Sequence, residues 1–184
     1  KKYFVGFDST HISSAPLPVA NHAGEFVNQK DTNFYHKDEN KHYSRAKNIT
    51  RSLQEIEVSL KNKQIKRIGH GSVLALEIDD YVSKAKSNEP QSTQKEIKEA
   101  IELQEDLIEK IAKRKGKNRI YMEANPTSNV LIGGFSYKTH PIKLFEEKGI
   151  QYTISTDDRV TFNTNMKKEF YHIFRDKRSL IILF

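Results

Sequence analysis

The sequence contains no cysteine, which excludes disulfide bonds and thiolate metal sites and fits a reducing, cytoplasmic compartment. No apolar run approaches the roughly 18 residues of a membrane-spanning helix, and no signal peptide opens the chain. Basic stretches interleaved with aromatic residues are also missing, so nucleic-acid binding is not expected in spite of a formal net charge of +7. The lysines are scattered or alternate with acids, as in KEIKEAIELQEDLIEKIAKRKGK.

At 184 residues, with 36% hydrophobic and 30% charged residues, the chain has the composition of one globular domain with a polar surface. No internal repeat or low-complexity linker divides it. The chain begins with Lys1 and stops on the apolar stretch LIILF, so both ends are expected to be cut from a longer polypeptide.

Strands and helices are predicted to alternate along the chain. A capping box at Thr93 and Glu96 opens a helix over residues 93–115, and Pro141 lies in the first turn of another over residues 139–149. Residues 28–48 and 83–91 are polar and non-periodic and are expected to form loops. Short β-branched or aromatic runs predict strands at Tyr3–Phe7, Pro18–Asn21, Ile65–Gly69, Arg119–Met122 and Ile150–Ser155.

This alternation implies an α/β fold with a parallel sheet. Ionisable residues follow the carboxyl ends of the expected strands and should converge on one rim, where barrels keep their chemistry. A doubly wound open sheet is the alternative, but no glycine-rich phosphate loop follows the first strand. The rim residues are Asp8, His22 with Glu25, His70, Glu123 with Asn125, and Asp157 with Asp158.

Four short motifs, NHAGE, RIGHG, EANPTSN and STDD, occur in this order. Together they resemble the adenosine deaminases of the metal-dependent amidohydrolase superfamily, from VGFD at residues 5–8 to about Phe174. The resemblance implies a TIM-type (β/α) barrel and zinc-dependent hydrolytic deamination of adenosine, deoxyadenosine or an adenine nucleotide to the inosine form. The expected partner is therefore a small purine nucleoside or nucleotide.

The resemblance also implies roles for the rim residues. His22 and Asp157 resemble zinc ligands, Glu25 the acid that shuttles protons to the purine ring, and His70 the histidine that orients the attacking water. Such an acid is needed because purine C6 becomes tetrahedral only when ring nitrogen N1 receives a proton.

Two further residues are implied to meet the substrate. Gly24 resembles the residue whose backbone N–H meets the base, and Asp158 the group that hydrogen-bonds the purine. The EANPTSN stretch is expected to be structural, a turn that hydrogen-bonds its own backbone. The remaining histidines are expected at the surface or in structural roles: His11, His36, His42, His140 and His172.

The chain departs from the family pattern at its start. The pattern opens with a strand carrying a His-x-His pair of zinc ligands, and this sequence has no such pair. Residues 1–184 therefore match roughly the last five strands of an eight-stranded barrel domain. The missing strands are expected in an omitted part of the same polypeptide, and the fragment alone is expected to be inactive. The alternatives are a catalytically inactive, deaminase-derived structural or regulatory module, and an amidohydrolase acting on another amine. The oligomeric state stays open.

Arg159 stands where the family usually has proline. At the rim of a pocket, its guanidinium could bind a phosphate bidentately. The sequence leaves two hypotheses, a phosphorylated adenine nucleotide as substrate, or a surface arginine paired with an acid such as Glu169.

Overall fold

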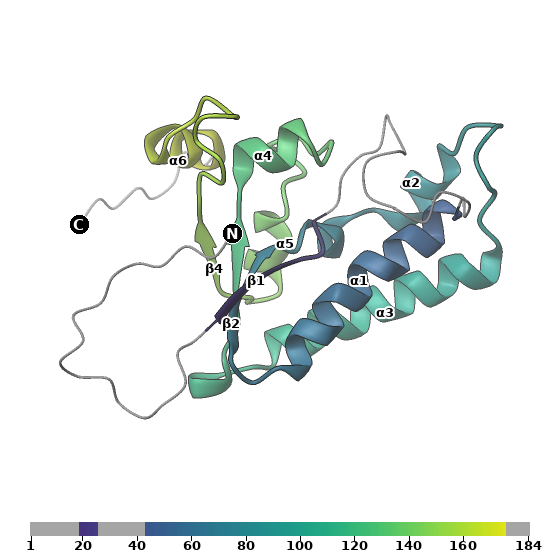
Figure 1. The fold of residues 1–184 in the computed structure, drawn as a ribbon, viewed down its shortest axis with the longest axis horizontal. Helices are drawn as coiled ribbons and strands as arrows, with labels where there is room; N and C mark the ends of the chain where they lie inside the picture. Colours follow the sequence, from purple (N-terminus) through teal and green to yellow (C-terminus); the bar gives the residue numbers. More distant parts are fainter. Residues whose placement is uncertain (1–18, 26–42, 176–184) are drawn as a thin grey trace.

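A computed structural model describes residues 19–25 and 43–175, so the strand expected at Tyr3–Phe7 lies outside the described residues. Figure 1 shows the sheet with the paired helices α1 and α3 to one side of it and the shorter α4, α5 and α6 around β3 and β4. In chain order the elements are β1 Val19–Ala23, α1 Arg45–Lys61, β2 Ile65–His70, η2 Ser72–Ala75, α2 Ile78–Ser83, α3 Gln94–Ala112, η3 Gly116–Asn118, β3 Tyr121–Ala124, α4 Pro126–Leu131, α5 Ile142–Glu147, β4 Tyr152–Ile154 and α6 Met166–Phe174.

The four described strands form one parallel sheet in the order β1-β2-β3-β4. Ile68 and Met122 are paired across β2 and β3, and both are fully buried in a core shared with α1, α3 and α5. The alternate residues Arg67, Gly69 and Glu123 belong to the opposite face of the sheet, where the side chains of Arg67 and Glu123 form an ion pair at 3.0 Å. The helices therefore cover one face of the sheet.

This arrangement distinguishes between the two expected architectures. A doubly wound sheet reverses its strand order and carries helices on both faces. Here sequential parallel strands and helices on one face match an arc of a (β/α) barrel, in which the inner face is polar at the catalytic end. The α/β barrel expectation is confirmed.

Helix α1 corrects the loop expected over residues 28–48. Residues 28–42 lie outside the described part, but the helix already begins at Arg45, where Ser44 caps it by accepting a hydrogen bond from the Lys47 amide. A buried stripe starts at Ala46, which explains why the polar composition was misleading: it reflects only the exposed face. Arg45 also forms an ion pair with Glu89 at 2.6 Å.

Other boundaries agree with the sequence in part. The capping box of Thr93 and Glu96 is present, although α3 ends at Ala112 rather than at residue 115. Strand β3 lies two residues later than expected, and Ile120, just before it, is already part of the core. Within the two described ranges, no helix combines the length and the apolar character needed to cross a bilayer.

Candidate active site

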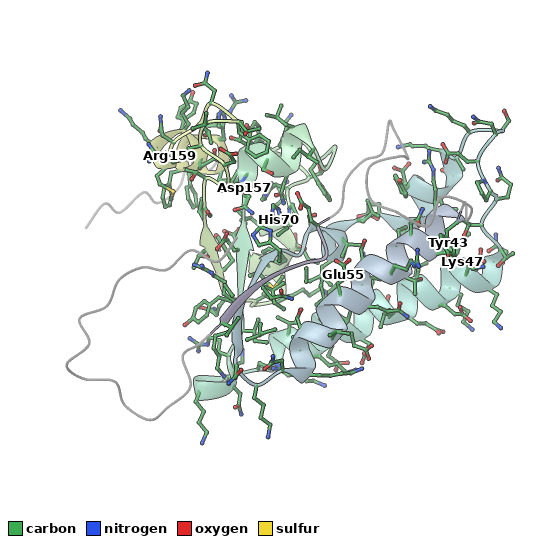
Figure 2. The ribbon with its side chains drawn as sticks, viewed as in Figure 1. Tyr43, Lys47, Glu55, His70, Asp157 and Arg159 are labelled. Atoms are coloured by element: carbon green, nitrogen blue, oxygen red, sulfur yellow. The ribbon has the colours of Figure 1, made fainter. Side chains whose placement is uncertain are left out.

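Four of the residues singled out in the sequence meet at the carboxyl end of the sheet. His22 lies in β1, His70 is the last residue of β2, and candidate ligand atoms of His22, Glu25 and His70 all lie within 4.8 Å of one another. Asp157, after β4, completes the group, with its Oδ2 atom 3.7 Å from Nε2 of His70. Glu25 Oε2 lies 3.8 Å from the same nitrogen. Figure 2 shows His70 and Asp157 close together at this end of the sheet.

The two histidines contact each other directly. Their rings meet edge to face with centroids 4.9 Å apart. This contact depends on Gly69, because a Cβ atom at that position would lie 2.8 Å from Cδ2 of His22. Glycine at the next-to-last position of β2 is therefore needed for the imidazole of His22 to lie across the neighbouring strand.

The backbone is strained at two of these side chains. His70 has a φ of 65° and Asp157 a φ of 55°, in the left-handed region that residues other than glycine rarely adopt. The turn of the chain after each strand aims these side chains at the rim. Strain of this kind costs about 1–3 kcal/mol per residue and concentrates at functional sites.

Backbone hydrogen bonds hold the loop after β1 to the loop after β2. The Gly71 amide donates to the Ala23 carbonyl and the Val73 amide donates to the Gly24 carbonyl, both at 3.1 Å. Gly24 has a φ of 65°, and a Cβ there would lie 2.4 Å from Cδ1 of Ile56. These hydrogen bonds fix the backbone that precedes Glu25 relative to His70.

Asn125 and Asn129 contact His70, a role that the sequence did not reveal. Oδ1 of Asn129 lies 3.3 Å from Nδ1 of the buried ring, and the side-chain amide nitrogen of Asn125 lies 3.2 Å from Nδ1 and 3.3 Å from Nε2. Asn129 thus offers an acceptor to Nδ1, and Asn125 offers a donor that reaches both ring nitrogens. Nε2 is the ring nitrogen nearest Glu25 and Asp157.

The expectation that EANPTSN only forms a self-bonded turn is therefore wrong at its two asparagines. Glu123 and Ala124 end β3, and the rest of the stretch begins helix α4, with Pro126 in its first turn and no side chain capping it. Asn125 and Asn129 are four residues apart, a spacing that places both on one face of a helix. That spacing is the signal that could have identified the pair.

Gly24 and Asp158 also lie at the carboxyl end of the sheet, but both form hydrogen bonds to other groups of the protein. The Gly24 amide donates to Oε2 of Glu55 at 3.1 Å. The Asp158 carboxylate is exposed and accepts hydrogen bonds from the Val160 amide and from the amide and hydroxyl of Thr161. The bond from the Thr161 hydroxyl is the main cause that holds the pKa of Asp158 below its ordinary value. The role of each toward a substrate stays a prediction.

Arg159 is exposed, and the pairing with Glu169 is wrong. Glu169 is fully buried and instead accepts hydrogen bonds from the Thr127 amide, at 2.9 Å, and from the hydroxyls of Thr127 and Thr164. These bonds fix the start of α4 to α6. Figure 2 shows Arg159 beyond Asp157, on the side away from the sheet.

The donor set fits a zinc ion. Imidazole nitrogens and carboxylate oxygens are the ligands of catalytic zinc, which binds each at about 2 Å, so two ligands of one ion lie within about 4 Å of each other. The separations among His22, Glu25 and His70, all within 4.8 Å, are close to this limit, so small side-chain movements would bring the three groups to one ion. His70 and Glu25 can serve either as ligands or, as the sequence indicates, beside the metal.

Comparisons with known proteins agree with this geometry. The family described as adenosine deaminase matches residues 32–180. Adenosine deaminase 1 of Streptomyces coelicolor is 28% identical over 173 residues, which cover 92% of this chain and 36% of that protein. Adenosine deaminase of Plasmodium gallinaceum is 38% identical over 71 residues, 38% of this chain and 18% of that protein.

A third relative, adenosine deaminase of Clostridium botulinum, is 46% identical over 56 residues, 30% of this chain and 16% of that protein. This chain thus spans about a third of the length of the Streptomyces coelicolor relative, given its 36% coverage. No solved structure matches it. The family match covers most of the chain, and its strands and site residues follow the expected order, so the chain belongs to the adenosine deaminase family.

Proposed function

We propose that the chain is the C-terminal part of a zinc-dependent deaminase that converts adenosine, deoxyadenosine or an adenine nucleotide to the inosine form. The observation that carries this proposal is the group of His22, Glu25, His70 and Asp157 at one end of a parallel sheet. The preceding barrel strands, with the remaining zinc ligands, would lie in the same polypeptide. A cytoplasmic location stays a prediction.

In this proposal His22 and Asp157 hold the metal. Zinc bound at such a site lowers the pKa of a bound water towards about 7 and so supplies a nucleophile at neutral pH. Nε2 of His70, the ring nitrogen that lies 3.8 Å from Glu25 and 3.7 Å from Asp157, would accept a hydrogen bond from the attacking water and orient it. Glu25 in its acid form gives a proton to purine N1 as C6 becomes tetrahedral. Ammonia leaves, and the product is the inosine form.

Measurements of zinc content and deaminase activity distinguish the proposed enzyme from the catalytically inactive module. The polypeptide that includes the preceding strands should contain equimolar zinc and convert adenosine to inosine, whereas residues 1–184 alone should bind zinc weakly and be inactive. His22→Ala should lower the zinc content of the longer polypeptide, because His22 is a proposed ligand. The control is His172→Ala, which changes a histidine whose ring stacks on Tyr137 and which is not among the proposed ligands. A longer polypeptide without zinc and without turnover would favour the inactive module.

A phosphorylated substrate is favoured by one observation, the exposed Arg159 two residues after Asp157, with Glu169 bound elsewhere. We expect Arg159→Ala to lower kcat/KM for AMP and ATP by about tenfold, the effect of losing roughly 1.4 kcal/mol, and to leave adenosine unchanged. Arg159→Lys keeps the charge without the bidentate fork and should recover part of the loss. Equal losses on adenosine, AMP and ATP would make Arg159 a structural residue.

A further inference from the structure

Helix α1 contacts the loop of Gly24 through two consecutive residues. The carboxylate of Glu55 accepts the hydrogen bond of the Gly24 amide, and the Ile56 side chain lies so close to Gly24 that a Cβ would be 2.4 Å from its Cδ1 atom. Ile56 is fully buried whereas Glu55 is exposed. Figure 2 shows Glu55 in the middle of α1, between the end of the sheet marked by His70 and the end of the helix marked by Lys47.

One turn later the same helix contacts β1 again. Ser59 Oγ accepts a hydrogen bond at 2.8 Å from the side-chain amide of Asn21 and donates one, also at 2.8 Å, to the Glu55 carbonyl. Residues 55 and 59 lie on one face of the helix because they are four positions apart. That face therefore binds the polypeptide on either side of His22.

Among residues 19–25 and 43–175, Glu55 is the one acceptor found for the Gly24 amide. The Gly24 carbonyl is bound by the Val73 amide at 3.1 Å and by the Ser72 hydroxyl at 3.5 Å, so one side of the peptide chain is attached to the segment after His70. The amide side is attached to Glu55. Glycine in the left-handed region has more accessible conformations than any other residue, so a loop at Gly24 depends on such bonds for its geometry.

We propose that Glu55 is a positioning residue: by binding the Gly24 amide, it fixes the direction of the chain into Glu25 and so the place of the Glu25 carboxylate opposite His70. His22 depends on it less, because β1 pairs His22 with Gly69. Hydrogen bonds to charged groups contribute more than neutral ones, so the Glu55 carboxylate is a strong acceptor for the Gly24 amide. The kinetic part of this inference rests on the proposed deaminase function.

The first test is hydrogen exchange at the Gly24 amide, which does not require activity. In the polypeptide with the preceding strands, Glu55→Ala should speed exchange of this amide by about tenfold, since it loses its acceptor. Glu55→Gln retains an acceptor oxygen and should keep exchange near that of the wild type. Glu57→Ala is the matched control, an acid of the same helix whose carboxylate faces Lys61 at 3.3 Å. Unchanged exchange in Glu55→Ala would overturn the proposal.

The second test separates positioning from folding. At equal thermal stability and zinc content, Glu55→Ala should lower kcat for adenosine by about tenfold with little change in KM, and Glu55→Gln should restore most of it. Faster exchange with unchanged kcat would show that Glu55 holds the loop without serving Glu25, and would overturn the inference. A wild-type protein without turnover would refute the proposed function, and exchange at Gly24 would then decide alone whether Glu55 fixes the loop.

Discussion

Glu25→Gln is expected to lower the turnover of adenosine by about 10²–10⁴, the usual loss when a general acid is removed. Glutamine keeps the shape and the hydrogen-bonding atoms of glutamate but has no proton to deliver to purine N1. The side chain of Glu25 is about one third exposed and lies 3.8 Å from Nε2 of His70. It therefore reaches both the rim and the group that would orient water.

The zinc content of this variant separates the two roles open to Glu25. As the proton donor, Glu25 is not a ligand, and Glu25→Gln should bind zinc with the stoichiometry of the wild type. Loss of zinc together with activity would make it a ligand, a role that the 4.8 Å cluster with His22 and His70 also permits. Near-normal turnover would show that the residue has been assigned wrongly. Glu77→Gln, in which an exposed acid after η2 is changed, is the control.

His140 is expected to make the stability of the protein fall in mild acid. Burial lowers its pKa from 6.5 to about 4. In the described part of the chain its Nε2 atom has no hydrogen-bond partner, while Nδ1 accepts from the Ile142 amide. The folded protein thus holds the ring neutral, whereas the unfolded chain binds a proton below pH 6.5. At about 1.4 kcal/mol per pH unit, this costs roughly 3 kcal/mol of stability as the pH falls from 6.5 to 4.

Urea unfolding at a series of pH values measures this effect. His140→Asn keeps an acceptor near the Ile142 amide but does not titrate, so its free energy of unfolding should change by roughly 3 kcal/mol less between pH 6.5 and 4. The comparison is between the pH dependences of the free energy of unfolding. A loss of stability in the variant that is the same at every pH therefore does not affect it. The same slope in His140→Asn would assign the acid sensitivity to other groups.

The sequence predicted the part of the site that depends on strand order. Parallel strands in sequence order end at one rim, so a polar residue at each strand end suffices to bring His22, Glu25, His70 and Asp157 together. The sheet arrangement followed from the same alternation of strands and helices. No detail of side-chain packing is required for either inference, which is why both could be drawn from the sequence.

The parts that the sequence missed depend on contacts between distant segments. Asn125 and Asn129 have the composition of a turn, and only the placement of α4 beside β2 brings them to His70. Glu55 is one acid among many on a charged helix, and its contact with Gly24 is set by the packing of α1 against β1. Local patterns do not distinguish an acid that binds a backbone amide from one that only faces water.

The left-handed backbone at His70 and Asp157 has a consequence for how such a chain changes over generations. Glycine adopts this conformation without strain, so replacing either residue by glycine would relieve it. At Asp157, whose side chain is partly exposed, a lineage released from catalysis would gain from such a substitution, whereas at the fully buried His70 it would also leave a cavity. Selection for turnover would oppose the change at Asp157, so a relative of this chain with glycine at that position is expected to have lost the role proposed here for the side chain.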